Sequence, residues 1–172
     1  MKTNKISTKK LTLLALSVAV AMIFSYVEIL LPSLSYIAPG LKIGLPNIVI
    51  ISILYIFGAK DAAIVSLIRV FLTTLLFAPS FIIIIYSLAG AVFSLAVMSL
   101  LKRTNLFSMI FVSIIGAISH NVAQIVLFIL ISKTPQIISY LPILLVGGVF
   151  SGLAVGIIAH FSYKYVKRLY KI

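Results

Sequence analysis

Carboxylates and thiols are almost absent from this sequence. Its 172 residues include no cysteine and only two acidic residues, Glu28 and Asp61. Without cysteine there is no disulfide and no thiolate-ligated metal site. Two carboxylates also leave little material for acid–base or metal-assisted catalysis. We therefore predict that the chain is not an enzyme, with no catalytic residues, no cofactor and no metal.

Hydrophobic residues, by contrast, make up 63% of the chain. One soluble globule cannot bury so large a fraction, whereas a bilayer accepts about 20 apolar residues as a helix that satisfies its own backbone hydrogen bonds. The sequence predicts a single all-α domain over residues 1–172, an integral membrane bundle of six transmembrane helices. Breaks at charges, prolines and polar turns place these helices at about 11–31, 44–58, 62–77, 81–101, 107–131 and 140–163.

The first of these segments also has the pattern of a secretory signal peptide. A lysine-rich start precedes an apolar stretch that contains Ala19-Val20-Ala21. The apolar run continues past that point to Leu31, which favours a helix that stays in the membrane.

The basic residues, which give a net charge of +12, lie mainly at the ends of the apolar runs. In nucleic-acid-binding proteins they would instead form stripes on folded faces. With the N-terminus inside, the outer loops contain only Lys42 and Lys133. The inner segments contain Lys2, Lys5, Lys9, Lys10, Lys60, Lys102, Arg103, Lys164, Lys167, Arg168 and Lys171. The positive-inside rule predicts a multi-pass protein of the cell membrane with both termini in the cytoplasm.

Arg69 is the remaining basic residue and lies within the third predicted helix. A charge inside a membrane costs at least about 2.5 kcal/mol, so it should face the bundle interior or a wet cavity and have a partner. Ala62, Ser66 and Thr73 share its helix face. The alternative is a purely structural ion pair, or a side chain that reaches the cytoplasmic surface.

The first predicted helix has two distinct faces. Glu28, on one face, is the natural candidate partner of Arg69 or Lys42, although a carboxylate near a helix end can also simply reach the headgroup region. Ala15 and Ala19 lie on another face, where small residues four apart let a partner helix approach closely. We predict an interior-facing side and a docking side.

One face of the fifth predicted helix ends in three hydrogen-bonding side chains, which are His120, Asn121 and Gln124. Amides and imidazoles inside a membrane need partners, so this cluster either orients a ligand or joins helices. We include all three in a predicted binding site. Glycines at four-residue spacing in the sixth helix, Gly152 and Gly156, indicate close helix packing instead.

An irregular segment precedes the second predicted helix. Residues 38–47 contain two prolines, two glycines, Lys42 and Asn47. Irregular backbone at membrane depth is tolerated where it lines a cavity, and a lysine beside a helix N-terminus attracts anions. Lys42 and Asn47 therefore join the predicted site, and an ordinary surface loop is the alternative.

Five stretches together resemble a known family. They are Pro39-Gly40-Leu41-Lys42-Ile43-Gly44-Leu45-Pro46-Asn47-Ile48-Val49, Ser66-Leu67-Ile68-Arg69-Val70, Tyr86-Ser87-Leu88-Ala89-Gly90, Ser119-His120-Asn121-Val122-Ala123-Gln124 and Tyr140-Leu141-Pro142 with the glycines that follow. Their ordered set, over about residues 10–160, resembles the Gx transporter family, also called the heptaprenyl diphosphate synthase component I family. Pro46 departs from the family pattern, which has a small residue such as alanine there.

The family is similar to the S components of energy-coupling factor transporters. The resemblance implies a six-helix, S-component-like bundle that captures its ligand from outside, with Ala15 and Ala19 docking an energy-coupling transmembrane subunit that works with ATPases. The chain has no P-loop of its own. Prenyl synthases bind Mg²⁺ through two aspartate-rich clusters, and Asp61 is the only aspartate here. The synthase label therefore does not describe catalysis by this chain.

The sequence thus predicts a membrane-embedded substrate-binding or uptake subunit for a small anionic or a vitamin-, flavin- or isoprenoid-like molecule. The predicted substrate-binding residues are Lys42, Asn47, Arg69, His120, Asn121, Gln124 and Glu28. Expected partners are membrane lipid, the small-molecule substrate and the energy-coupling subunit, and not nucleic acid. The alternative is a non-catalytic membrane accessory subunit in polyprenyl diphosphate or menaquinone biosynthesis, or in flavin-linked electron transfer. A secondary transporter that works alone is disfavoured because acidic residues for cation coupling are scarce.

Overall fold

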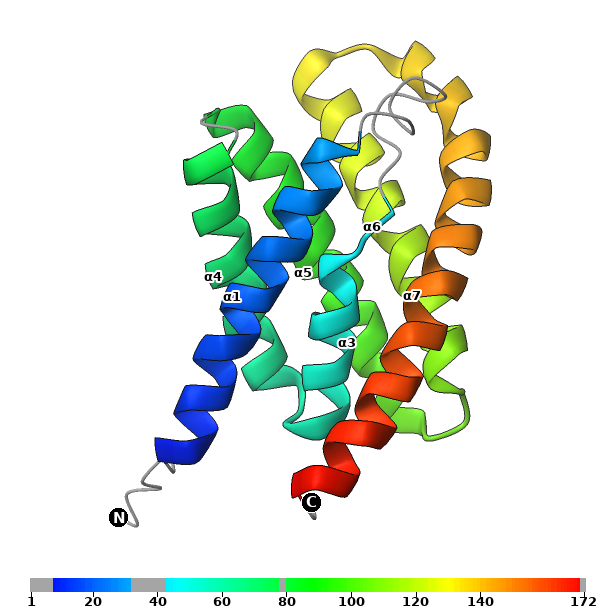
Figure 1. The fold of residues 1–172 in the computed structure, drawn as a ribbon. Coiled ribbons are helices and arrows are strands. Elements are labelled where there is room, and N and C mark those ends of the chain that lie inside the picture. The colour runs from blue at the N-terminus through cyan, green and yellow to red at the C-terminus, as the bar shows by residue number, and fades with distance from the viewer. Residues whose placement is uncertain (1–7, 32–42, 78–79, 171–172) are drawn as a thin grey trace, which may run out of the picture.

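The computed structural model describes residues 8–31, 43–77 and 80–170 of the chain. They form six α-helices and one short 3-10 helix, which confirms the all-α class (Figure 1). The elements are α1 (Thr8–Leu30), α3 (Pro46–Ile56), α4 (Ala59–Phe77), α5 (Phe81–Thr104), α6 (Met109–Ser132), η1 (Pro135–Tyr140) and α7 (Leu141–Tyr170).

Four of these helices are long and apolar enough to cross a membrane. They are α1, α5, α6 and the continuous segment from Pro135 to Arg168 that contains η1 and α7. The short α3 has 11 residues, about 16 Å at 1.5 Å per residue, which is half of the hydrocarbon thickness. The 19-residue α4 carries Lys60, Asp61 and Arg69. The four long apolar helices indicate a multi-pass membrane protein. Of the other two predicted spans, α3 is too short and α4 carries three charged residues.

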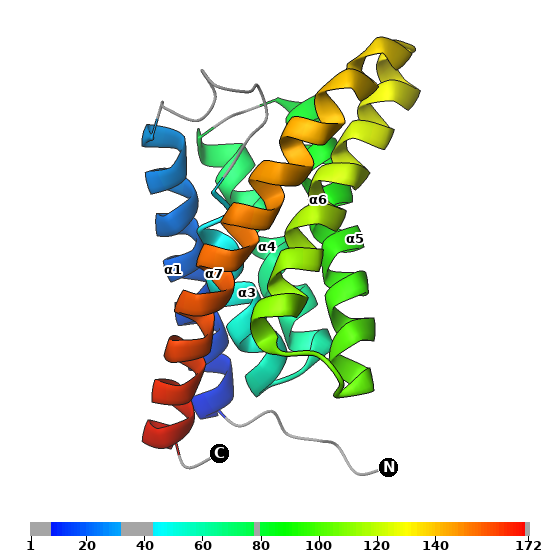
Figure 2. The same cartoon turned by 90° about the vertical axis from the view of Figure 1, so that its right-hand side faces the viewer.

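The start of α1 and the end of α7 lie at the same end of the bundle (Figures 1 and 2). We call it the terminal end; it also contains the α3–α4 turn around Gly58 and the α5–α6 turn around Asn105. The opposite, distal end contains the end of α1, the start of α5 and η1. This arrangement follows from an even number of helices that alternate in direction.

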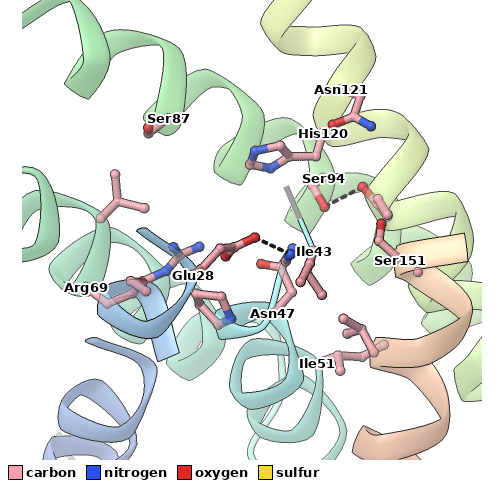
Figure 3. A pocket seen from close by; sticks show the side chains of 18 of the residues that line it. Glu28, Ile43, Asn47, Ile51, Arg69, Ser87, Ser94, His120, Asn121 and Ser151 are labelled. Carbon is pink, nitrogen blue, oxygen red and sulfur yellow. Dashed lines mark hydrogen bonds between the residues drawn. The ribbon is translucent and has the colours of Figure 1, made fainter. Parts of the chain in front are cut away.

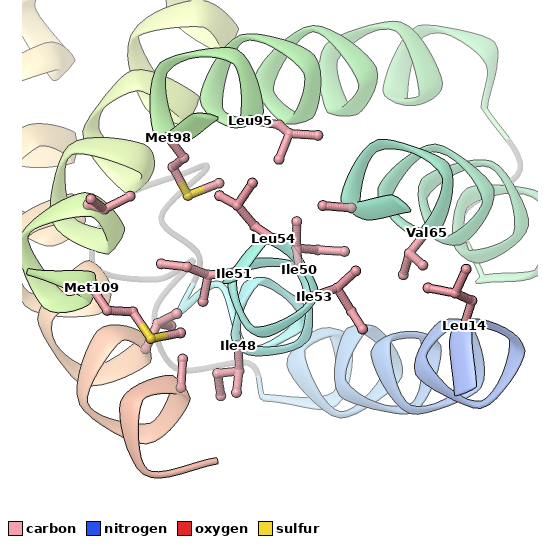
Figure 4. Packing of buried hydrophobic residues seen from close by; sticks show 14 residues of the cluster. Leu14, Ile48, Ile50, Ile51, Ile53, Leu54, Val65, Leu95, Met98 and Met109 are labelled. Atoms are coloured by element: carbon pink, nitrogen blue, oxygen red, sulfur yellow. The ribbon is translucent and has the colours of Figure 1, made fainter. Parts of the chain in front are cut away.

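The hydrophobic core surrounds α3 (Figure 4). Its Ile50, Ile51 and Leu54 are at most 1% exposed, and the helix packs on α1, α4 and α7. A helix that is apolar on every face belongs either in a protein core or in the lipid, and the burial of α3 places it in the core. Because this core fills the interior of the terminal half of the bundle, a cavity between all the helices is expected in the distal half.

Helices α6 and α7 approach each other through the glycines that the sequence marks as packing positions. A Cβ atom on Gly152 would lie 2.6 Å from Ile114 Cα, and one on Gly156 would lie 2.8 Å from Ile110 Cα. Backbone atoms at such distances cannot move aside as a flexible side chain can. These glycines therefore set the separation of the two helices.

Replacing Gly152 with alanine should destabilise the protein by about 1–3 kcal/mol, because the added methyl group meets the backbone of α6. Thermal unfolding of the purified protein in detergent measures the effect. Ala154→Ser is the matched control, since it adds one heavy atom on the exposed side of the same helix. Equal stability of the two variants would show that α6 and α7 do not depend on this contact.

Candidate functional site

A cavity of about 390 Å³ lies in the distal half of the bundle, beyond the N-terminus of α3 (Figure 3). All six α-helices contribute to its walls, and the volume falls within the range of small-molecule pockets. Its polar lining comes from residues Ser25, Glu28, Asn47, Arg69, Thr73, Thr74, Ser87, Ser94, Ser113, His120, Asn121 and Ser151. Apolar residues, among them Ile51, Ile83, Met98 and Val155, form the rest of the lining.

Five of the seven residues predicted to bind substrate line this cavity. They are Glu28, Asn47, Arg69, His120 and Asn121, which come from α1, α3, α4 and α6.

The other two predicted residues have different positions. Gln124 is not among the lining residues, because one turn beyond His120 its amide faces α5, where Nε2 donates to the Tyr86 carbonyl at 3.5 Å. Lys42 lies outside the described residues. For Gln124 the structure thus supports the alternative that the sequence left open, a contact between helices.

Arg69 and Glu28 place opposite charges on one side of the cavity, from α4 and α1 (Figure 3). The two charges interact electrostatically. Glu28 Oε1 also accepts a hydrogen bond from the Gly44 amide at 2.6 Å. Within the described part of the chain, the buried Nε of Arg69 and the buried hydroxyl of Thr73 have no hydrogen-bond partner. Buried donors of this kind are costly unless a ligand or water satisfies them.

The backbone turn before α3 positions both Gly44 and Asn47. Gly44 has a φ of +78°, a left-handed conformation that glycine adopts at little cost. Its carbonyl accepts a hydrogen bond from the backbone N–H of Asn47 at 2.8 Å, while its own N–H donates to Glu28 Oε1. Pro46, the departure from the family pattern, lies in the first turn of α3, where its fixed φ favours the helix and no N–H is needed.

The α6 wall of the cavity is fixed from both sides. Asn121 Nδ2 donates to the Leu144 carbonyl of α7 at 2.8 Å, and the Ser94 hydroxyl of α5 donates to the Gly116 carbonyl at 2.8 Å. His120 lies directly over Gly90 of α5, where a Cβ atom would be only 2.7 Å from imidazole Cε1 and Nε2. Gly90 therefore provides the space that the imidazole occupies beside the cavity.

Several cavity residues were not predicted as binding residues from the sequence. They include Ser87 and Ser94 of α5, Thr74 of α4 and Ser151 of α7. All three serines line the cavity, and the hydroxyl of Ser94 also joins α5 to α6 through its hydrogen bond (Figure 3). A serine on a membrane helix gives the same sequence signal in both roles.

The interior face of α1 agrees with its sequence pattern. Ala21 and Ser25 are buried toward the bundle, and Glu28 reaches the cavity. Ala15 and Ala19 are exposed on the outside of the helix. The two faces are thus real features of the fold, and the outer one is free within the described chain.

The two acidic side chains of the chain lie far apart in the structure. Asp61 pairs with Lys10 at 2.8 Å on the terminal side of α1, and Lys10 and Glu28 are 18 residues apart on that helix. At 1.5 Å per residue, the only two carboxylates of the chain are on the order of 25 Å apart. In the described residues no group of three or more His, Cys, Asp or Glu side chains could hold a metal ion. One cation, one carboxylate, an imidazole, two amides and seven hydroxyl groups line the cavity together with apolar side chains.

Gly90→Ala should displace the imidazole of His120 at a cost of no more than about 1.5 kcal/mol, because a side chain can leave its rotamer. Histidine-labelled protein provides the readout by NMR, since the chain has only His120 and the exposed His160. The His120 resonances should shift while those of His160 stay in place. Unchanged His120 resonances in a folded variant would contradict the contact.

The chain matches a known family model. The model for heptaprenyl diphosphate synthase component I covers residues 17–162, a range that includes every residue lining the cavity. No curated protein and no solved structure matches the sequence. The resemblance seen in the sequence motifs is confirmed: the chain belongs to the heptaprenyl diphosphate synthase component I family.

Proposed function

We propose that this membrane protein is a substrate-binding subunit that takes up a small anionic molecule with an apolar portion. The observation that carries the proposal is the position of Arg69, a cation that borders a cavity inside a membrane bundle. Charged residues at membrane depth are costly and usually serve substrate or ion pathways. Glu28 offsets part of this cost, while the unpartnered Nε of Arg69 leaves a donor for a ligand.

The lining supports a ligand with two chemically different parts. Arg69, His120 and the Asn47 amide suit a carboxylate, phosphate or other strong acceptor. Ile51, Met98 and Val155 on the side of the core suit an apolar part. A vitamin-, flavin- or isoprenoid-like molecule combines these properties.

The direction of capture in this proposal follows from the position of the cavity and from the basic residues. The core closes the terminal half, so the cavity is nearer the distal end. Basic residues are concentrated at the terminal end, which the positive-inside rule assigns to the cytoplasm. A ligand would therefore enter from the outer side.

The subunit would depend on partners for energy and would not catalyse a reaction itself. Its two carboxylates are too far apart to act together, and the sequence has no P-loop. The exposed face of α1 that contains Ala15 and Ala19 offers small side chains against which a helix of a transmembrane coupling subunit, associated with ATPases, can pack closely.

Arg69→Gln should weaken binding of the co-purifying ligand by about 2–5 kcal/mol, roughly 30-fold or more, because the ligand loses a buried charge-assisted hydrogen bond. Native mass spectrometry of the purified protein measures the occupancy. Arg103→Gln is the control, since it removes the same charge from an exposed position outside the cavity.

Removing Arg69 alone also leaves the half-buried Glu28 carboxylate without its counter-charge, which can impair folding. The double variant Glu28→Gln/Arg69→Gln avoids this problem because both sites become neutral amides. We expect it to fold and to lack ligand. A folded double variant with wild-type occupancy would refute the site.

A second function is favoured by the name of the matched family, heptaprenyl diphosphate synthase component I. The chain could be a non-catalytic membrane accessory subunit in polyprenyl diphosphate or menaquinone biosynthesis, or in flavin-linked electron transfer. Affinity purification from the native membrane separates the two functions. Recovery of an ATPase module supports uptake, and recovery of a prenyl synthase subunit supports the accessory role.

Ala15→Leu/Ala19→Leu should reduce recovery of the coupling module at least about tenfold, because bulky side chains keep a partner helix from the small-residue face. The amount of each co-purified subunit is measured by quantitative mass spectrometry. Ala96→Leu/Ala154→Leu is the matched control, with the same change at exposed alanines of α5 and α7. Equal recovery with both double variants would exclude docking through this face of α1.

A further inference from the structure

A second hollow, of about 450 Å³, lies at the terminal end, between the α3–α4 turn and the end of α5. It shares no residue with the cavity described above. Its lining consists of Leu54, Phe57, Ala59, Lys60, Asp61, Ser99, Lys102, Arg103 and Asn105. We call it the basic pocket, because three of these nine residues are cationic.

The charge of the basic pocket is positive even after its carboxylate is counted. Lys60, Lys102 and Arg103 supply three cations, and Asp61 supplies the only anion in the lining. Asp61 is already paired with Lys10 of α1, at 2.8 Å. The three cations therefore retain their attraction for an anion from outside the chain.

Lys102 is held in place before any ligand arrives. Its Nζ donates to the Leu54 carbonyl at 2.5 Å and lies 5.2 Å from the centre of the Tyr55 ring. A lysine ammonium has three donors, so two remain for another acceptor. Part of the entropy cost of ligand binding is thus already met by the fold.

The start of α4 reinforces this field. Ala59, Lys60 and Asp61 form its first turn and line the basic pocket. The first N–H groups of a helix have no intrahelical acceptors, and the helix dipole is positive there. The dipole of α4 therefore adds to the attraction of the three cationic side chains for an anion in the pocket.

We propose that the basic pocket binds the phosphate group of an anionic phospholipid such as phosphatidylglycerol. The pocket lies at an end of a membrane bundle, where headgroups are found, and basic pockets between membrane helices bind anionic headgroups. Leu54 and Phe57 supply apolar contacts for the neighbouring glycerol and acyl region. Free phosphate has the same anionic chemistry and is the alternative source of the ligand.

The test counts lipids bound to the full-length protein by native mass spectrometry during titration with phosphatidylglycerol or phosphatidylcholine in neutral detergent. Lys60→Gln/Arg103→Gln removes two exposed cations of the pocket and leaves the half-buried hydrogen bond of Lys102 intact. Each basic residue near an anionic surface contributes a factor of roughly five, so this variant should bind phosphatidylglycerol about 30-fold more weakly.

Lys164→Gln/Arg168→Gln is the matched control, because it removes two exposed cations from α7 at the same end of the molecule, outside the pocket. It should keep wild-type lipid affinity within about a factor of two. Equal losses in both double variants, or no preference of the wild type for phosphatidylglycerol over phosphatidylcholine, would overturn the proposal.

Two further measurements complete the design. Asp61→Asn removes the one carboxylate and releases Lys10, so the proposal requires tighter phosphatidylglycerol binding; weaker binding in a folded variant contradicts it. Inorganic phosphate is added as a competitor. If phosphate displaces the lipid from the wild type but not from the Lys60/Arg103 variant, the result supports the site and identifies free phosphate as a ligand. Lipid binding that resists phosphate supports a headgroup site.

Discussion

The charge of Arg69 is the constraint on which the architecture depends. A guanidinium between membrane helices needs a counter-charge, hydrogen-bond acceptors and a route to polar surroundings. Glu28 of α1 supplies the counter-charge, and the cavity supplies the polar surroundings. Glu28 is in turn held by the Gly44 amide. One half-buried cation thus ties together α4, α1 and the turn that begins α3, and these three elements form one side of the cavity.

The sequence predicts the faces of helices better than the use of each residue. Periodicity alone places Ala62, Ser66 and Thr73 with Arg69, and the first two are at most 3% exposed. It also separates the buried Ala21 from the exposed Ala19. Gln124 shows the limit of this reasoning: it continues the polar face of α6, yet its amide joins the α5 backbone. The direction of one side chain depends on which neighbour packs beside it, and a single sequence does not contain that information.

Helix length is a second property that composition describes only in part. The alternation of apolar runs and breaks predicts six helices, and the described residues form six. It does not show that α3, with 11 residues, begins well inside the bundle. Three charges in α4, similarly, distinguish it from a simple apolar span. Both helices are stabilised by protein neighbours rather than by lipid alone, because α3 packs on α1, α4 and α7.

A helix that begins at membrane depth exposes N–H groups that lipid cannot satisfy. Membrane proteins tolerate such a start only where it is buried in protein or borders a cavity, and helix ends of this kind often face anionic groups of substrates. In this chain the Gly44 amide just before α3 already bonds to the Glu28 carboxylate, so an anionic acceptor is present there without ligand. Arg69 lies beside the same carboxylate. A ligand anion would therefore enter a site in which Glu28 already uses some of the donors. It can bind without displacing the Glu28 carboxylate only by accepting hydrogen bonds from the remaining donors of Arg69 and of α6. The short length of α3 and the polarity of the cavity are thus two consequences of the same local geometry.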